Sequence, residues 1–208
     1  MYATLAGSAP LLLGFALGMR HAFDADHIVA MSTIATRERS LVRAAFLGGA
    51  WGAGHCVTLF TVGLLVLFFR LPMPESWSVF FERVVGIMLV VLGTASLVAR
   101  RRPDAGTAAH ASAPSHRRPF LVGVVHGLAG SGALALAVLA TIPSRGAGLL
   151  YIALFGVGAI GGMMLITFLF AIPARFATGV KAGAGGWLSA AASVGSVAFG
   201  IYYLYHGA

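Results

Sequence analysis

The sequence predicts an all-α integral membrane protein in which six transmembrane helices form two inverted three-helix repeats. The first observation is composition, since 59% of the 208 residues are hydrophobic, 10% are charged and the mean hydropathy is +0.90. Such values are typical of polytopic membrane proteins and exclude an ordinary soluble domain. The second is a set of six apolar runs, each long enough for a bilayer crossing of about 20 residues. The third is a weak similarity between the first three runs and the last three.

The predicted spans are joined by short segments, apart from one longer linker. The first span is long for a single crossing and carries a charged cluster, so it is a candidate for an interrupted helix. Segment 100–119 is rich in Arg, Pro, Ala and Ser, which is typical of a flexible linker. We expect one transmembrane domain over 1–208, with repeat one at 9–99 and repeat two at 120–206. The spans are predicted near 9–35, 44–69, 80–99, 120–141, 149–172 and 187–205.

The two halves share spaced glycines and histidines. Gly18 and His21 in the first span correspond to Gly123 and His126 in the fourth. Because each half has an odd number of spans, the second half must enter the membrane from the opposite side. This is the inverted repeat of many secondary transporters, which bind substrate between the repeats near the midplane; chance similarity within an ordinary helical bundle is the alternative. The other matched positions are Gly48 with Gly156, Gly52 with Ile160, Gly54 with Gly162, His55 with Met163 and Gly93 with Gly200.

Positive charge is distributed unevenly between the two sides. The loops after spans one, three and five hold ten Lys and Arg residues, and the opposite side holds three. Cytoplasmic loops of membrane proteins carry the excess of Lys and Arg. We therefore expect the protein in the cell (inner) membrane, with the linker in the cytoplasm and both termini outside it. Because the arginines lie in short loops between apolar spans, no nucleic-acid partner is expected.

The segment HAFDADH places ionisable side chains inside the first span. It contains His21, Asp24, Asp26 and His27, and Arg20 directly precedes it. Ionisable groups at the bilayer centre cost about 2.5–3.5 kcal/mol each on insertion scales, so the cluster must pair internally, face a water-filled cavity or hold an ion. Neutral imidazole and carboxylate form a ligand set for divalent nickel, cobalt or zinc. The alternative is a structural Arg–Asp and His–Asp network that holds helices together.

Helical geometry restricts which of these side chains can meet. At about 100° per residue, Asp24 lies about 60° and His27 about 120° from His21, whereas Asp26 lies about 140° away on the other flank. An unbroken helix therefore cannot bring all four to one ion. If the helix is intact, Asp26 orients a histidine or pairs with Arg20. If the helix unwinds, Asp24 or Asp26 caps a second half-helix. In the second case, the break in the helix lies on the path of the ion.

Two further histidines lie in other spans. His55 follows Trp51-Gly-Ala-Gly54, whose missing side chains allow the first span to approach closely. A histidine satisfied within the core is the alternative there. His126 is the repeat equivalent of His21. The candidate metal-binding residues are therefore His21, Asp24, Asp26, His27, His55 and His126.

These residues resemble the nickel/cobalt transporter (NiCoT) family, whose signature is RHAxDADHI in one membrane helix and a GHS-type motif in the next. Here they stand as Arg20-His-Ala-Phe-Asp-Ala-Asp-His-Ile28 and Gly54-His-Cys56, with cysteine at the usual hydroxyl position. In the second half, Ser131-Gly-Ala-Leu-Ala135 lacks the carboxylates of longer members and is similar to the short urease-accessory-type members. The metal-binding positions that the resemblance implies are His21, Asp24, Asp26, His27 and His55.

The cluster and the resemblance predict a secondary transporter of a divalent transition-metal cation, nickel or cobalt. No ATP-binding motif occurs, no resident cofactor is expected, and the protein is not expected to be an enzyme. One alternative is an exporter of an organic or oxyanion substrate, of the lysine-exporter or sulfite-exporter type, which two aspartates disfavour. The other is an intramembrane serine protease with Ser131 as nucleophile, for which the sixth span offers only His206 at its end as a base. Import and export are equally compatible with the site.

Overall fold

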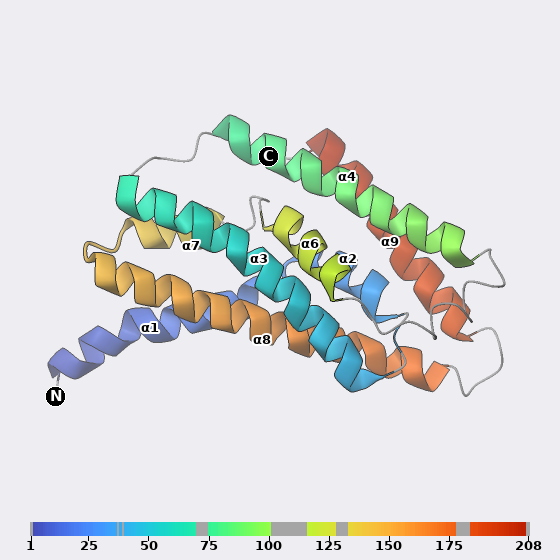
Figure 1. Ribbon diagram of the computed structural model, residues 1–208, viewed down its shortest axis with the longest axis horizontal. Coiled ribbons are helices and arrows are strands. Elements are labelled where there is room, and N and C mark those ends of the chain that lie inside the picture. The colour runs from blue at the N-terminus through green and yellow to red at the C-terminus, as the bar shows by residue number, and fades with distance from the viewer. Residues whose placement is uncertain are drawn as a thin grey trace.

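The computed structural model describes residues 2–36, 38, 40–69, 75–100, 116–127, 133–177 and 184–206 (Figure 1). Within these ranges the regular structure is helical, in agreement with the predicted all-α class. The helices are α1 (Tyr2–His21), α2 (Ala25–Ala35), α3 (Leu41–Phe69), α4 (Glu75–Arg100), α6 (Arg117–His126), α7 (Ala133–Ala140), α8 (Arg145–Ala177) and α9 (Ala184–His206).

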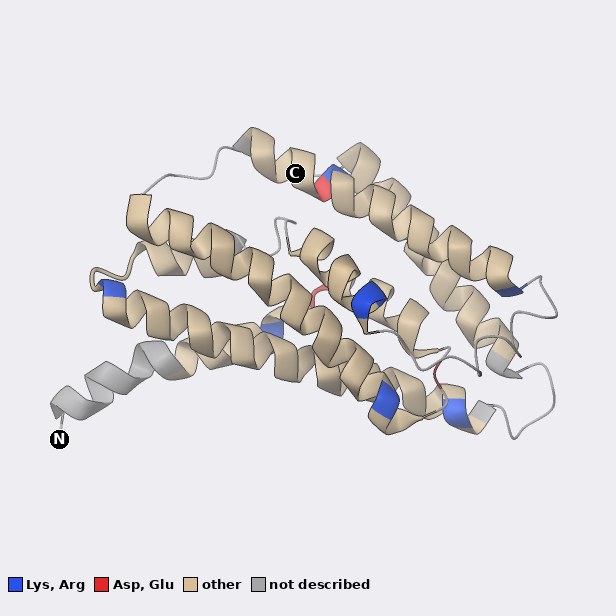
Figure 2. Cartoon of the chain, in the orientation of Figure 1, with Lys and Arg blue, Asp and Glu red and all other residues tan. Residues whose placement is uncertain are grey.

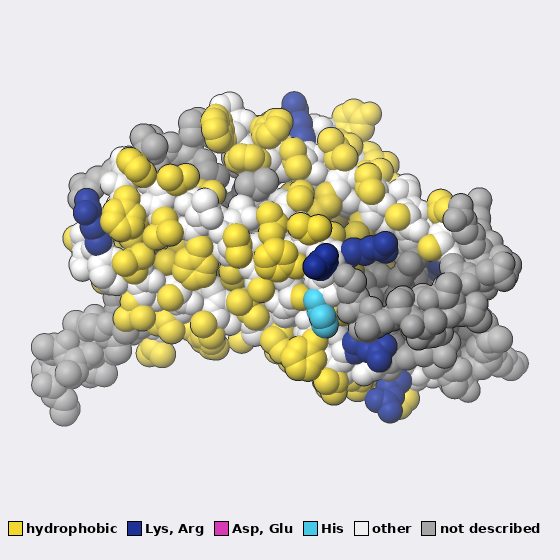
Figure 3. All heavy atoms as spheres, in the orientation of Figure 1, with side chains coloured by type: hydrophobic (Ala, Val, Ile, Leu, Met, Phe, Trp, Pro, Cys, Tyr) yellow, Lys and Arg dark blue, Asp and Glu magenta, His cyan; other side chains and the backbone are white. Residues whose placement is uncertain are grey.

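Among the described residues, four helices are long and apolar enough to cross a membrane: α3, α4, α8 and α9. α3 has 29 residues and α8 has 33. At about 1.5 Å per residue, both exceed the hydrocarbon core of about 30 Å. Many of their large hydrophobic side chains point outward, and Figure 3 shows hydrophobic side chains over most of the described part of one face. The chain is therefore an all-α membrane protein.

The first and fourth predicted spans are each built from two helices. α1 and α2 occupy the first span, and α6 and α7 the fourth, so the expected six helices become eight in the described ranges. The break in the first span was predicted from its charged cluster, whereas the break in the fourth was not. In the sequence, Gly127, Gly130 and Gly132 lie between α6 and α7. Glycine is about 1 kcal/mol less favourable than alanine in a helix, which weakens a continuous helix there.

The chain leaves α1 through a tight turn before α2 begins. The Phe23 N–H donates to the Arg20 carbonyl at 2.9 Å, and the Asp24 N–H donates to the His21 carbonyl at 3.0 Å. Asp24 then adopts an extended conformation (φ −64°, ψ 147°) and is the N-cap residue of α2, although its carboxylate makes no capping bond. The predicted interruption is confirmed, and Asp24 rather than Asp26 precedes the second half-helix.

The helices form two groups with short helices between them. α8 packs against both α1 and α3, and α4 pairs with α9, while α2 and α6 lie between these groups (Figure 1). Most of the coloured arginines lie near helix ends, and acidic residues are few (Figure 2). Asp26, just after the α1–α2 break, is buried. The packing thus brings the break and the end of α6 to the middle of the molecule.

Two glycines allow α6 and α1 to approach the long helices. A Cβ at Gly54 of α3 would overlap the carbonyl oxygen of Phe120 in α6 and would lie 3.0 Å from the Val124 nitrogen. A Cβ at Gly18 of α1 would overlap the carbonyl oxygen of Phe155 in α8. Small residues permit such close backbone contacts between membrane helices. Each glycine lies within one turn of a candidate histidine, so these contacts set how near the helices bring the candidate ligands.

Candidate metal centre

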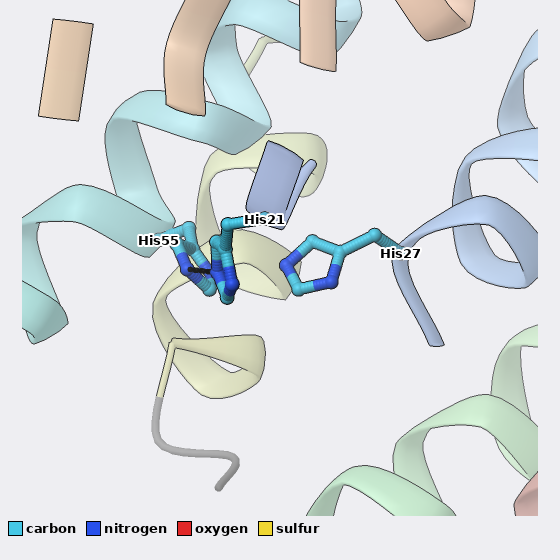
Figure 4. Close-up of side chains that lie close together, drawn as sticks. All are labelled: His21, His27 and His55. Atoms are coloured by element: carbon cyan, nitrogen blue, oxygen red, sulfur yellow. Dashed lines mark hydrogen bonds between the residues drawn. The ribbon is translucent and has the colours of Figure 1, made fainter. Parts of the chain in front are cut away.

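Three histidine rings from three helices meet in the interior. His21 is the last residue of α1, His27 lies in the first turn of α2 and His55 lies in α3 (Figure 4). Their exposed fractions are 5%, 0% and 0%. The Nε2 atoms of His21 and His55 are 2.8 Å apart, and one ring nitrogen from each residue lies within 4.8 Å of the others. We call these three residues the imidazole triad, and their spacing allows three nitrogens to contact one ion.

Carboxylates hold two of these rings from behind. Asp24 Oδ2 lies 3.1 Å from His21 Nδ1, and Asp26 Oδ1 lies 2.9 Å from His27 Nδ1. Because an ionised carboxylate only accepts, each neutral ring donates from Nδ1 and keeps a lone pair on Nε2. The other nitrogen of His27, Nε2, points toward His21 and His55 (Figure 4). This atom has no hydrogen-bond partner among the described residues. Carboxylates orient metal-binding histidines in this way.

Asp26 also connects the two halves of the chain. Its Oδ1 accepts the backbone N–H of His27 at 3.0 Å, and its Oδ2 accepts the Nε2–H of His126 at 3.1 Å. One ligand atom each from Asp26, His27 and His126 lies within 4.8 Å of the others, and all three residues are buried. We call them the carboxylate triad. The pair that the sequence allowed between Asp26 and Arg20 is not the one formed, because imidazoles occupy both carboxylate oxygens and Arg20 is exposed.

Aromatic side chains form walls around the rings. The Trp51 ring stacks on His27 with centroids 5.9 Å apart and meets His126 edge-on at 5.2 Å. The Phe155 ring lies 5.4 Å from the ring of His21. Apolar walls exclude water, and the faces of aromatic rings favour a nearby cation. The sequence placed Trp51 beside His55 but did not indicate that its ring contacts both His27 and His126.

Helix ends add to the electrostatics of the centre. α1 ends at His21 and α6 ends at His126, so two helix C-termini meet there. The C-terminal end of a helix carries partial negative charge and favours a cation. α2 begins here with the opposite polarity, and Asp24 and Asp26 stand at that positive end. The polarity that opposes a cation is thus offset by two carboxylates and two helix C-termini.

Other polar residues of the chain lie away from this centre. His116 and His206 are exposed at helix ends. The thiol of Cys56 donates to the Gly156 carbonyl at 3.5 Å and so faces α8. Ser131, the nucleophile of the protease alternative, lies outside the described residues, as do residues 101–115 of the predicted linker.

Glu82 is a charged residue that the sequence reasoning did not single out. It lies in α4, is partly exposed, and is close enough to Asp26 for their charges to interact. The available signal was a carboxylate inside the predicted third span, since ionisable residues at membrane depth are usually functional.

Comparison with known proteins identifies the family. The chain is 31% identical to the urease accessory protein UreH of Bacillus sp. (strain TB-90) over 207 aligned residues, which cover 94% of this chain and 90% of that protein. The chain belongs to the UreH family. As a member of a family of accessory proteins it is not an enzyme, as expected from the sequence. No family model matches the chain, and no solved structure matches it.

Two plant proteins are more distant relatives of this UreH-family chain. The chloroplast proteins FOR GROWTH AND FERTILITY 1 and 2 of Arabidopsis thaliana are 27% identical over 172 residues and 25% identical over 166. Each match covers 72% of this chain but only 46% and 44% of the respective plant protein. The shared region is therefore less than half of either plant protein.

Proposed function

We propose that this UreH-family protein is a secondary membrane transporter of a divalent transition-metal cation, nickel or cobalt. The observation that supports it best is the buried nitrogen His27 Nε2, which lacks a partner among the described residues and points toward His21 and His55. Imidazole suits nickel and other borderline divalent metals. The name of the Bacillus relative connects that protein with urease, and this kinship favours nickel over cobalt as the first metal to test.

Coordination geometry agrees with this proposal. Metal–imidazole bonds of about 2.0–2.1 Å set neighbouring ligand nitrogens roughly 3 Å apart. His21 Nε2 and His55 Nε2 are already 2.8 Å apart, so little movement is needed to admit an ion. His55 Nε2–H donates to His21 Nε2, and a bound metal would shift this proton to His55 Nδ1, which has no partner in the described part of the chain. In the proposed site, the imidazole triad contacts the ion. Asp24 and Asp26 hold the rings of His21 and His27, and His126 holds Asp26.

The alternatives fit the centre less well. A structural His–Asp network satisfies its own donors and acceptors, because buried unpaired polar atoms are costly. Here Nε2 of His27 and Nδ1 of His55 and His126 are buried without partners among the described residues. An organic-anion or oxyanion exporter would bring negative charge against Asp24 and Asp26, which face the same centre.

We infer that the halves 9–99 and 120–206 are inverted repeats, and reciprocal contacts between α4 and α9 support this. A Cβ at Gly93 would lie 2.6 Å from the Ser193 carbonyl oxygen, and a Cβ at Gly200 would lie 2.6 Å from the Gly86 carbonyl oxygen. Gly93 and Gly200 are 107 positions apart in the sequence, and so are the residues that they contact, Gly86 and Ser193. Such reciprocity is what a two-fold axis produces. These contacts favour the predicted match of Gly93 with Gly200.

The middle helices of the halves show the same reciprocity with a different register. Gly54 of α3 meets the Phe120 carbonyl of α6, and Gly158 of α8 meets the Phe15 carbonyl of α1. These contacts favour a match of Gly54 with Gly158, whereas the sequence comparison matched it with Gly162, one helical turn further on. Spaced glycines recur every turn or so in α8, and so similarity alone selects the register poorly.

We further propose that the protein lies in the cell (inner) membrane with both termini outside the cytoplasm. The ten-to-three distribution of Lys and Arg between the two sides supports this orientation. Linker 100–119 is then cytoplasmic and joins the two halves. No ATP-binding motif occurs in the sequence, so transport is driven by the gradient of the ion itself or of a coupling ion, or else depends on a separate partner protein.

The test is metal transport by purified protein in proteoliposomes, with ⁶³Ni²⁺ or Co²⁺ measured inside the vesicles. Wild type should accumulate the metal, and His27→Ala should lose transport because it removes the unpartnered nitrogen. His116→Ala is the matched control, since His116 is exposed at the start of α6 and should leave transport unchanged. Equal transport by wild type and His27→Ala would contradict the proposal.

A further inference from the structure

We propose that Asp26, His27 and His126 form a second cation site that alternates with the imidazole triad during transport. This inference rests on the proposed function and concerns the path of the ion through the centre. The imidazole triad offers three nitrogens, whereas the carboxylate triad offers two nitrogens and a carboxylate oxygen. The metal therefore passes between two different donor sets that share one histidine.

The carboxylate triad has the composition and burial of a metal site. Its residues are 1%, 0% and 0% exposed. The carboxylate oxygens of Asp26 lie 2.9 Å from His27 Nδ1 and 3.1 Å from His126 Nε2, and the two rings are 4.4 Å apart between centroids. These separations are close to those between neighbouring ligands around a divalent ion, about 3 Å. A small movement therefore lets an ion take the place of the two N–H protons that the carboxylate accepts. Each proton moves to the other nitrogen of its own ring, His27 Nε2 or His126 Nδ1, and both of these atoms lack a partner among the described residues.

His27 makes the two sites mutually exclusive. Its Nδ1 belongs to the carboxylate triad through Asp26, and its Nε2 points toward His21 and His55. Two divalent ions bound on opposite edges of one imidazole would repel each other strongly at this short separation. One ion is therefore held at a time. An ion that is to cross the membrane must be bound favourably enough to enter. It must also be able to leave, which is easier when binding is divided over more than one site.

The two sites differ in which half of the chain supplies them. The imidazole triad comes wholly from α1, α2 and α3, in the first half. The carboxylate triad needs His126 from α6, in the second half. Movement of α6 relative to α2 therefore opens or closes the carboxylate triad and leaves the imidazole triad intact. This couples the position of the ion to the relative position of the two halves.

The experiment uses Co²⁺ with the purified full-length protein, because its d–d absorption reports donor type and number. Wild type should bind one Co²⁺. His126→Ala should still bind one Co²⁺ with the spectrum of a three-nitrogen site, and the double variant His21→Ala/His55→Ala should bind one with a different spectrum. In proteoliposomes His126→Ala should lose at least tenfold of the Co²⁺ transport rate while keeping Co²⁺ binding. His116→Ala should match wild type in both assays.

His126→Gln separates a metal-binding role from a structural one. The glutamine amide can still donate a hydrogen bond to Asp26, but it lacks the imidazole nitrogen. We expect this variant to fold and bind Co²⁺ as wild type does and to lose transport. Wild-type transport by His126→Gln, loss of all binding in His21→Ala/His55→Ala, or two Co²⁺ per wild-type chain would each overturn the second site. Absence of Co²⁺ binding by wild type would instead overturn the proposed function itself.

Discussion

Gly54→Ala should destabilise the protein and disconnect α6 from the centre. The added Cβ would overlap the Phe120 carbonyl oxygen and would lie 3.0 Å from the Val124 nitrogen, both in the backbone of α6, so neither can rotate away. Overpacking of this kind costs about 1–3 kcal/mol. Alanine is otherwise favoured over glycine in a helix by about 1 kcal/mol, so a net loss of stability reports the overlap.

The size of the effect on the centre follows from one distance. His126 Nε2 lies 3.1 Å from Asp26 Oδ2, and hydrogen bonds are lost beyond roughly 3.5 Å. Displacement of α6 by about 0.5 Å or more is therefore enough to break this contact. After the gain of about 1 kcal/mol from helix propensity, the net loss of stability is up to about 2 kcal/mol. At about 2–4 °C per kcal/mol for a chain of this length, Tm should fall by up to about 8 °C.

Gly195→Ala provides the matched control in another membrane helix. A Cβ at Gly195 of α9 would meet no atom within 4 Å. The two variants and wild type are compared in the same detergent by thermal unfolding, and then by Ni²⁺ transport in proteoliposomes. Gly195→Ala should keep or raise Tm and leave transport unchanged. If Gly54→Ala is as stable and active as Gly195→Ala, then the close approach of α3 and α6 does not determine the geometry of the centre.

Three other predictions concern ligands, orientation and the supporting carboxylate. His27→Ala should weaken Ni²⁺ or Co²⁺ binding at least tenfold in calorimetry, since loss of a residue that only orients a ligand already lowers metal affinity about 10–100-fold. Unchanged affinity would show that the metal site does not lie here. A reporter inserted in linker 100–119 should be cytoplasmic and one fused after Ala208 external, and reporters in the same compartment would exclude the proposed topology. Asp26→Asn should lower Ni²⁺ affinity about 10–100-fold, because the amide holds His27 and His126 less firmly; wild-type affinity would show that Asp26 does not orient the rings.

The sequence alone determined the class of the protein and the position of its polar centre. Hydropathy and length are local properties, because the bilayer acts on each segment separately and requires about 20 apolar residues per crossing. The same local physics made the cluster around His21 and Asp26 conspicuous. Helical periodicity indicated a break there as one of two alternatives, since an intact helix turns Asp26 away from His21 and leaves it only a supporting role.

Tertiary structure decided which groups meet and what each one does. Asp26 and His126 are 100 residues apart, and only the packing of α6 against α3 brings them to 3.1 Å. The break between α6 and α7 went unpredicted because no charged residue marks it, and glycines in membrane helices serve packing as often as interruption. Whether Asp26 binds an ion or orients His27 depends on hydrogen bonds across helices. Those bonds are set by backbone contacts at Gly54 and Gly18, because the distance between two helices depends on the side chains of both at once.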